Sequence, residues 1–195
     1  DHRHINTESD SEVLLNVLAH ELGRASNGQR LEVNDIFQAV RAVHKRLKGS
    51  YAVIAMIAGH GLLAFRDPHG IRPLCMGQRE DGTVMLASES VALEGSGIPV
   101  KRDVAPGEAV FVNLHGHITT EQCAESSILN PCLFEYVYLA RPDSTLDGIS
   151  VYRARLKMGE TLAQRLVSFL APNEIDTVIP VPESSRPSAM QLAQA

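Results

Sequence analysis

The sequence predicts an α+β protein, in which two helices precede an antiparallel sheet region and a parallel α/β unit begins near the end. Three observations support this fold class. Apolar residues recur at helical spacing over residues 10–49. Short runs rich in Val, Ile, Leu and Phe, separated by turns that contain glycine, occupy residues 51–120. A strand, a polar loop and a helix follow one another over residues 177–195, as at the start of a parallel α/β unit.

The first helix is expected from about Asp10 to Leu22. Ser9 and Glu12 fit the S-x-x-E capping box, in which the two side chains satisfy backbone N–H groups at the helix start. Apolar residues follow at helical spacing, and Gly23 is expected to end the helix. The pattern therefore predicts a helix with one apolar face at the start of the chain.

A second helix is expected between Asn34 as N-cap and Gly49 as C-cap, again with one apolar face. After Ser50 the pattern changes to short strands, and Asp81-Gly82 predicts a tight hairpin. The expected strands are Tyr51–Ile57, Leu62–Arg66, Leu74–Arg79, Thr83–Ser88, Ala109–Leu114 and His117–Thr120.

The last third of the sequence reads as a separate unit. Leu133–Ala140 is expected to form a strand, Ser150–Leu170 a helix and Thr177–Val181 a short strand before a helix-prone tail. We place an α+β domain at residues 1–125 and a linker with the beginning of an α/β domain at residues 126–195.

The composition favours a globular protein with small-molecule ligands. The 195 residues are 44% hydrophobic and 21% charged, with a net charge of −5. No basic stripe supports binding to nucleic acid or to an anionic membrane. The longest apolar run, Tyr51–Ala58, is too short to cross a bilayer. Cys75, Cys123 and Cys132 form no CxxC pair, which favours reduced, buried thiols in a cytosolic protein.

Two features could carry chemistry. Asp10 lies in the first turn of a helix, where a carboxylate either stabilises the helix dipole or holds the ammonium group of an amino-acid ligand. The loop from Pro182 to Ser185 offers hydroxyls and backbone N–H groups at a helix start, an arrangement that binds phosphate. A hydroxyl there could also ligate Mg²⁺. The alternative for this loop is an ordinary turn between a strand and a helix.

Five segments resemble the glutamine phosphoribosylpyrophosphate amidotransferase family. The Arg-Asp-Pro-x-Gly element is shared with other glutamine-dependent amidotransferases, such as asparagine synthetases, whereas the segment that begins at Cys132 is much more specific for this family. The segments are residues 4–12 (HINTESDSE), 65–74 (FRDPHGIRPL), 87–93 (ASESVAL), 132–144 (CLFEYVYLARPDS) and 180–185 (PVPESS).

The resemblance implies a fold and an activity. The fold is part of an N-terminal-nucleophile glutaminase, a four-layer αββα sandwich, followed by the start of a type I phosphoribosyltransferase domain. The parent enzyme would form 5-phosphoribosylamine from phosphoribosylpyrophosphate, glutamine and water, the first step of de novo purine synthesis. It would be a cytoplasmic homo-oligomer, a dimer or a tetramer, inhibited by purine nucleotides.

The resemblance also implies roles for individual residues. Asp10 would bind the α-amino group of glutamine. Ser184 would lie beside the Mg²⁺ of bound phosphoribosylpyrophosphate, with Glu183 and Ser185 in the same pyrophosphate loop. Cys132 occupies the position of a ligand in iron–sulfur members of the family, so a 4Fe–4S cluster in the parent is a further expectation. Such a cluster usually needs four thiolates, and members without one can keep a cysteine at this position.

The chain also departs from the family pattern. The family's nucleophilic cysteine, the arginine for the glutamine carboxylate and the Asn-Gly oxyanion hole would all lie upstream of Asp1. We therefore expect an internal fragment that is inactive on its own. Two alternatives stay open: a ligand-binding module without catalysis, and an amidotransferase with another acceptor, as in asparagine synthetases or sugar-phosphate amidotransferases.

Overall fold

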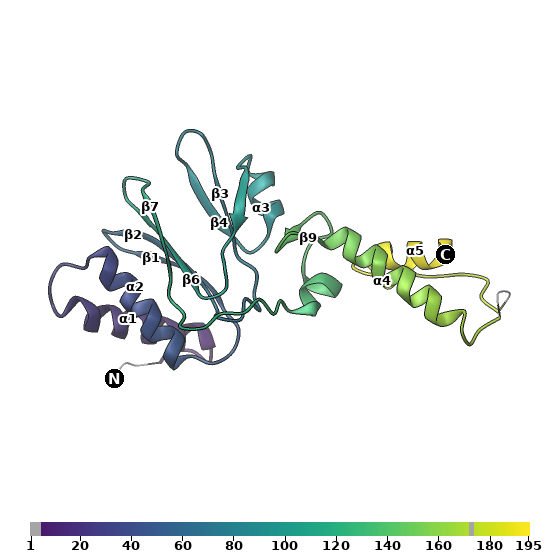
Figure 1. Ribbon diagram of the computed structural model, residues 1–195, viewed down its shortest axis with the longest axis horizontal. Helices are drawn as coiled ribbons and strands as arrows, with labels where there is room; N and C mark the ends of the chain where they lie inside the picture. Colours follow the sequence, from purple (N-terminus) through teal and green to yellow (C-terminus); the bar gives the residue numbers. More distant parts are fainter. Residues whose placement is uncertain (1–4, 172–173) are drawn as a thin grey trace.

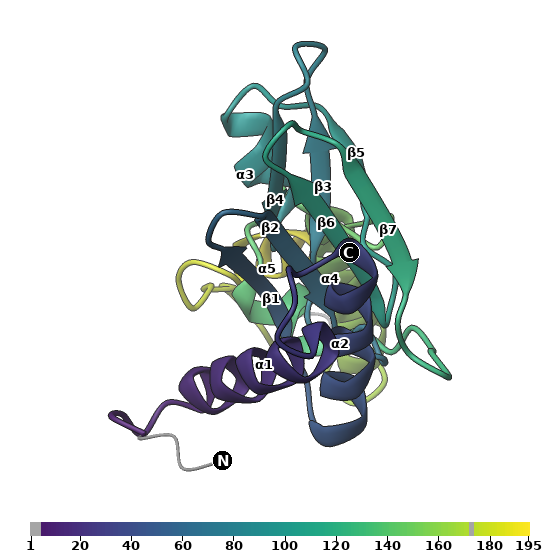
Figure 2. The same ribbon diagram turned by 90° about the vertical axis from the view of Figure 1, so that its left-hand side faces the viewer.

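The computed structural model describes residues 5–171 and 174–195, which form a broad body and a narrow arm (Figure 1). The body contains helices α1 (Asp10–Ser26) and α2 (Val33–Arg46), two antiparallel sheets and the short helix α3 (Ser90–Gly95). The last two helices of the chain form the arm. Figure 2 shows α1 and α2 in front of the sheet that they cover.

Helix α1 begins where the sequence predicts and ends later. Ser9 is its N-cap, and the Ser9 hydroxyl accepts a hydrogen bond from the N–H of Ser11. The expected end at Gly23 is wrong, because the helix continues to Ser26. It ends where Asn27 takes a left-handed conformation, with φ of 49°. A glycine inside a helix costs only about 1 kcal/mol, so it does not end the helix by itself.

Helix α2 is present, but both of its expected caps are displaced. Glu32 is the N-cap of a capping box: its carboxylate accepts a hydrogen bond from the N–H of Asp35, and the Asp35 carboxylate accepts one from the N–H of Glu32 at 2.9 Å. Asn34, the expected N-cap, lies inside the first turn. The helix ends at Arg46, and its C-cap is Leu47 rather than Gly49. Glu32 can therefore serve at an N-cap position that usually takes Ser, Thr, Asp or Asn, because its partner Asp35 lies three residues further on.

The larger sheet has four antiparallel strands in the order β1-β2-β6-β7. Successive residues of its central strands point to opposite faces, as the pleat of a strand requires. Leu63 and Phe65 face the α1 and α2 helices, whereas Ala64 faces the second sheet. The strands are β1 (Ala52–Ile57), β2 (Gly61–Arg66), β6 (Glu108–Asn113) and β7 (Ile118–Gln122).

The smaller sheet has three strands in the order β4-β3-β5. The expected hairpin at Asp81-Gly82 is confirmed, since it joins the antiparallel strands β3 and β4. The sequence did not predict β5 or α3, because both are too short and too polar to give a periodic apolar pattern. The strands are β3 (Cys75–Gln78), β4 (Val84–Ala87) and β5 (Val100–Asp103).

Three apolar clusters hold the layers of the body together. The first lies between the α1–α2 pair and the larger sheet and includes Phe37 and Phe65. The second lies between the two sheets and includes Met76 and Val110. The third joins the smaller sheet to α3 through Leu93. The body is therefore built as helices, sheet, sheet and helix, which is the four-layer order expected from the resemblance.

The expected strand at Leu133–Ala140 is wrong. Residues Glu135–Leu139 form a single π-helical turn, η1. The buried guanidinium of Arg155 donates hydrogen bonds to the carbonyl groups of Tyr136 and Ala140, at 2.8 and 2.7 Å. These bonds satisfy acceptors that a strand would direct to a neighbouring strand. A distant arginine therefore decides the conformation of this segment.

Two helices and a small hairpin complete the arm. Ser150 caps α4 (Val151–Leu166) with its hydroxyl, close to the expected helix start, and α4 packs along α5 (Arg186–Gln194). The hairpin is formed by β8 (Thr145–Leu146) and β9 (Ile149–Ser150). None of the helices in the described part of the chain is both long and apolar enough to cross a membrane.

The expected strand at Thr177–Val181 is also wrong. These residues have no regular secondary structure, and the side chains of Ile179 and Val181 are 81% and 76% exposed. A strand needs a neighbour to accept its hydrogen bonds, and no described strand lies beside this segment. Apolar composition alone therefore did not produce a strand.

Backbone hydrogen bonds tie the body to the residues that lead to the arm. Residues 123–134, which we call the crossing segment, run along the loop that follows β2. Ile128, Asn130 and Cys132 donate their N–H groups to carbonyl oxygens of residues 68–71 at 2.8–3.2 Å. The division into domains 1–125 and 126–195 stays a prediction, and these contacts cross it.

A buried ion pair completes this junction. The Arg66 guanidinium binds both carboxylate oxygens of Asp147, at 2.7 and 2.8 Å. The two side chains are only 1% and 7% exposed. Asp147 lies in the turn between β8 and β9, so the pair joins the end of β2 to the hairpin at the base of the arm.

We expect Arg66→Met and Asp147→Asn each to lower the free energy of unfolding by about 3–5 kcal/mol, because either change leaves a buried charge without its partner. Urea denaturation of the chain measures this change. Arg141→Met, which removes an exposed ion pair with Asp143, is the matched control and should cost about 1 kcal/mol or less. Equal losses in the three variants would contradict a special role for the buried pair.

Candidate functional site

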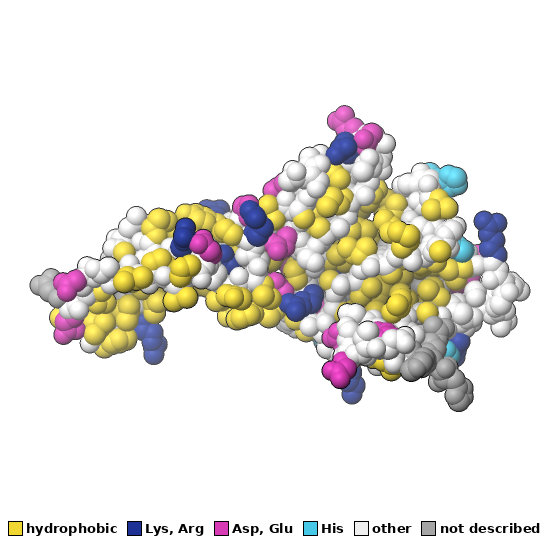
Figure 3. Space-filling model, turned by 180° about the vertical axis from the view of Figure 1, so that it is seen from behind, with side chains coloured by type: hydrophobic (Ala, Val, Ile, Leu, Met, Phe, Trp, Pro, Cys, Tyr) yellow, Lys and Arg dark blue, Asp and Glu magenta, His cyan; other side chains and the backbone are white. Residues whose placement is uncertain are grey.

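A cavity of about 880 Å³ opens between α1, β1 and the residues that follow the crossing segment. Apolar side chains of α1 and β1, such as Val13, Leu15, Ile54 and Met56, form much of its lining. Hydrophobic side chains also gather widely on the body in Figure 3. The charged residues of the lining are Asp10, Lys48, Arg72, Glu89 and Glu135.

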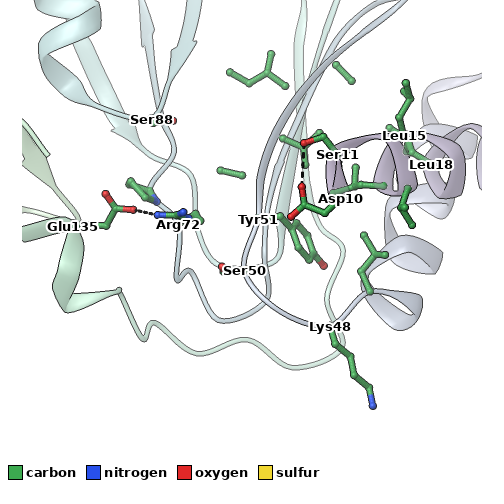
Figure 4. Close-up of a pocket in the computed structure, with 18 of the residues that line it drawn as sticks. Asp10, Ser11, Leu15, Leu18, Lys48, Ser50, Tyr51, Arg72, Ser88 and Glu135 are labelled. Carbon is green, nitrogen blue, oxygen red and sulfur yellow. Dashed lines mark hydrogen bonds and ion pairs between the residues drawn. The ribbon is translucent and has the colours of Figure 1, made fainter. Parts of the chain in front are cut away.

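Asp10 is the first residue of α1 and lies at the cavity beside Tyr51 (Figure 4). Its exposed carboxylate accepts only a long hydrogen bond, 3.5 Å, from the Ser11 hydroxyl among the described residues. The helix cap is supplied by Ser9 instead. Among the described residues, the Asp10 carboxylate thus has no cationic partner, and it lies at a helix end whose dipole favours an anion.

Glu12 organises the residues that lead into α1. Its carboxylate accepts hydrogen bonds from the N–H groups of Asn6 and Thr7 and from the Thr7 hydroxyl, at 2.6–2.8 Å. The hydroxyl of Thr7, followed by the backbone of Asn6, lowers the pKa of Glu12. The sequence assigned Glu12 to a capping box with Ser9, and the structure corrects this. Glu12 fixes the approach to Asp10 rather than the first turn.

Asp67 shapes the other side of the cavity. It accepts hydrogen bonds from the N–H groups of His69, Ile71 and Arg72 at 2.9–3.2 Å, which folds the Arg-Asp-Pro-x-Gly segment into a compact loop. Tyr51 pairs with this loop through its backbone and lines the cavity. Burial, followed by the charge of Asp67, raises the pKa of Tyr51 to about 12, so the phenol is neutral at physiological pH.

The far wall of the cavity contains charged groups from three regions of the chain. Arg72 donates a hydrogen bond to Glu135 at 2.5 Å (Figure 4). Glu89 accepts hydrogen bonds from the N–H of Arg141 and from the Ser144 hydroxyl, at 2.9 and 2.6 Å. The sequence did not single out any of these three cavity residues. Each lies inside a segment that resembles the family, and that was the only signal available.

The candidate pyrophosphate loop lies away from this cavity, on the arm. Glu183, Ser184 and Ser185 precede α5, and none of the three lines the cavity. Glu183 forms an ion pair with Arg186 at 2.8 Å, and the Ser185 hydroxyl donates to the carbonyl of Val181. The half-buried Ser184 has no hydrogen-bond partner for its hydroxyl among the described residues. The structure therefore keeps the two predicted sites separate.

The cysteines do not come together. Cys75 and Cys123 are buried in different apolar clusters, and Cys132 is half-buried on the crossing segment. Over residues 5–171 and 174–195, no group of three or more Cys, His, Asp or Glu side chains could hold a metal ion. No cysteine lines the cavity either. These three thiols thus do not build a cluster site between them.

Comparison with known proteins agrees with this architecture. The glutamine amidotransferase domain family matches residues 1–95. Curated proteins named amidophosphoribosyltransferase are 54% identical in Haemophilus influenzae, 51% in Escherichia coli and 48% in Saccharomyces cerevisiae, each over 98% of this chain. The chain is homologous to amidophosphoribosyltransferases. It spans 39% of the length of these relatives.

Two solved structures share the fold. The glutamine phosphoribosylpyrophosphate amidotransferase of B. subtilis, in complex with ADP and GMP, matches 99% of this chain with a TM-score of 0.81 and 32% identity. A structure described as the allosteric regulatory enzyme of purine biosynthesis matches equally well. Both matches cover 38% of the solved chain. The partial glutaminase sandwich is confirmed, whereas the start of a phosphoribosyltransferase domain stays a prediction.

The thiols should differ strongly in reactivity. Burial raises the pKa of Cys75 to about 12 and that of Cys123 to about 11, so little thiolate forms at pH 8. We expect Cys132 to react with a thiol reagent roughly 100-fold faster than the other two in the folded chain. A colorimetric thiol titration over time measures a fast phase from Cys132 and a slow phase from the two buried thiols. Cys132→Ser should remove the fast phase. Three fast thiols in the folded chain would contradict the burial of Cys75 and Cys123.

Proposed function

We propose that this chain is part of an amidophosphoribosyltransferase and supplies one side of its glutamine site. The reaction would convert phosphoribosylpyrophosphate, glutamine and water into 5-phosphoribosylamine, the first step of purine synthesis. The observation that carries this proposal is the cavity with Asp10 at the helix start, in a chain about half identical to proteins of that name. The apolar lining suits the methylene groups of glutamine, and the carboxylate suits its ammonium group.

The described residues of this chain bind and orient the substrate in this proposal. Asp10 would fix the α-amino end of glutamine, with α1 and β1 packed along the side chain. Cys75 and Cys123 are buried with raised pKa values and Cys132 lies outside the lining, so none of them acts on a ligand in the cavity. The nucleophile that the resemblance implies therefore has to come from other residues.

We also propose that Glu183, Ser184 and Ser185 bind the pyrophosphate group of phosphoribosylpyrophosphate. The hydroxyls precede α5, whose N-terminal N–H groups favour an anion. The oxygen donors fit Mg²⁺, which prefers few protein ligands and keeps substrate phosphates and water in its shell. When bound, Mg²⁺ would neutralise charge on the departing pyrophosphate. Ser184 would hold it, since the Ser184 hydroxyl has no described partner.

Other properties follow from the same proposal. Purine nucleotides would act as feedback inhibitors, which is supported by the ADP and GMP in the B. subtilis structure. A cytoplasmic homo-oligomer is the form we propose for the full enzyme. The iron–sulfur cluster at Cys132 stays a prediction, because the three thiols of this chain do not converge.

In the full-length protein, Asp10→Asn should raise the KM for glutamine by about 10- to 100-fold, because a hydrogen bond to a charged group contributes roughly 1.5–3 kcal/mol. Synthesis of phosphoribosylamine from free ammonia should be unchanged. Steady-state assays with the two nitrogen sources measure both effects. Glu160→Gln, an exposed change on α4, is the control. An unchanged KM for glutamine would refute the role of Asp10.

Ser184→Ala should raise the KM for phosphoribosylpyrophosphate by about 3- to 10-fold, because one ligand to Mg²⁺ or phosphate is lost. The KM for glutamine hydrolysis should stay the same. Ser168→Ala, whose hydroxyl bonds only a helix carbonyl, is the control. Nitrogen transfer that required ATP would favour a different acceptor, and nucleotide binding without glutamine turnover would favour a non-catalytic module.

A further inference from the structure

Hydrogen bonds hold the main chain of Arg72 on both sides, whereas its side chain has a single hydrogen-bond partner among the described residues. Its N–H donates to Asp67 at 3.2 Å, and its carbonyl accepts a hydrogen bond from the buried Arg66 at 2.7 Å. Its side chain is 46% exposed and lines the cavity. The guanidinium has five N–H donors, and the only described residue that binds it is Glu135. The direction of this side chain therefore depends on Glu135.

Glu135 is in turn held firmly by its surroundings. Its side chain is only 10% exposed, so its carboxylate needs a cation and Arg72 supplies it. The turn that carries Glu135 is closed by Arg155 of α4, which binds the carbonyl groups of Tyr136 and Ala140. The Tyr136 hydroxyl also donates to the carbonyl of Leu146 at 3.1 Å. The Glu135 carboxylate is thus a fixed point of attachment for the exposed guanidinium of Arg72.

We propose that Glu135 is a positioning residue for the glutamine cavity, and that it acts by holding Arg72 at the cavity wall. Arg72 then offers its remaining N–H groups to an oxygen of the bound amino acid, while Asp10 meets the ammonium group on the side of α1 (Figure 4). The inference rests on the proposed glutamine site. It assigns part of the affinity for glutamine to residues that follow the crossing segment.

The other ion pairs near the junction are less suited to position a group in the cavity. Arg66 and Asp147 are bonded to each other and do not line the cavity. Arg141 and Asp143 form an exposed pair that also lies outside the lining. The pair of Arg72 and Glu135 is the one described ion pair whose two members both line the cavity.

The test compares variants of the full-length enzyme by glutaminase kinetics. Glu135→Gln and Arg72→Gln should each raise the KM for glutamine by about 3- to 10-fold with kcat within about twofold, because a binding group is misplaced but the reacting atoms are not. The double variant should be no worse than Arg72→Gln, because one pair is being broken. Arg72→Lys should restore part of the loss, since it keeps the cation. Asp143→Asn is the matched control in the same segment.

The outcomes separate the inference from the proposed function. An active wild-type enzyme whose KM for glutamine is unchanged by Glu135→Gln would overturn the inference and leave the proposed function intact. Additive losses in the double variant would overturn it as well, because Glu135 would then act independently of Arg72. A wild-type enzyme with no glutamine turnover would overturn both. Thermal unfolding shows whether a variant folds, and a lowered Tm with unchanged KM counts against positioning.

Discussion

The guanidinium of Arg66 is the buried charge on which much of the remaining structure depends. It is 1% exposed and uses all five of its N–H donors. Three donors bind the carbonyl groups of Gly70, Arg72 and Val104, and two bind Asp147. A buried cation is tolerated only when it is paired and fully hydrogen-bonded. The loop after β2, the start of the turn before β6 and the hairpin at the arm must therefore take positions that satisfy this one side chain.

The same requirement connects the junction to the cavity. Arg66 binds the carbonyl of Arg72 while its neighbour Asp67 binds the N–H of Arg72, so two adjacent side chains fix one residue of the cavity wall. Asp147 holds Arg66 from the far side of the junction. The geometry of the cavity wall and the placement of the arm are consequently set by one polar network rather than by two independent ones.

Elements with a local cause could be predicted from the sequence. The cap at Ser9, the Asp81-Gly82 hairpin and the helix start near Ser150 each depend on residues close to one another in the chain. Elements with a distant cause could not. The turn η1 lies within the apolar run Leu133–Ala140, which also suits a strand, and Arg155 of α4 binds the carbonyl groups that favour the turn. The strand expected at Thr177–Val181 is absent for a related reason, because a strand needs a partner strand that can lie far away in the sequence.

The cavity residues differ in the same way in how far the sequence could predict them. Asp10 could be singled out because a carboxylate at a helix start is visible in the sequence, and the resemblance then gave it a role. Arg72 and Glu135 are 63 residues apart, and nothing in either residue type predicts that they meet. They meet because the crossing segment donates backbone hydrogen bonds to residues 68–71. Such bonds carry no side-chain signature, so a cavity wall built through them can be found only in the folded chain.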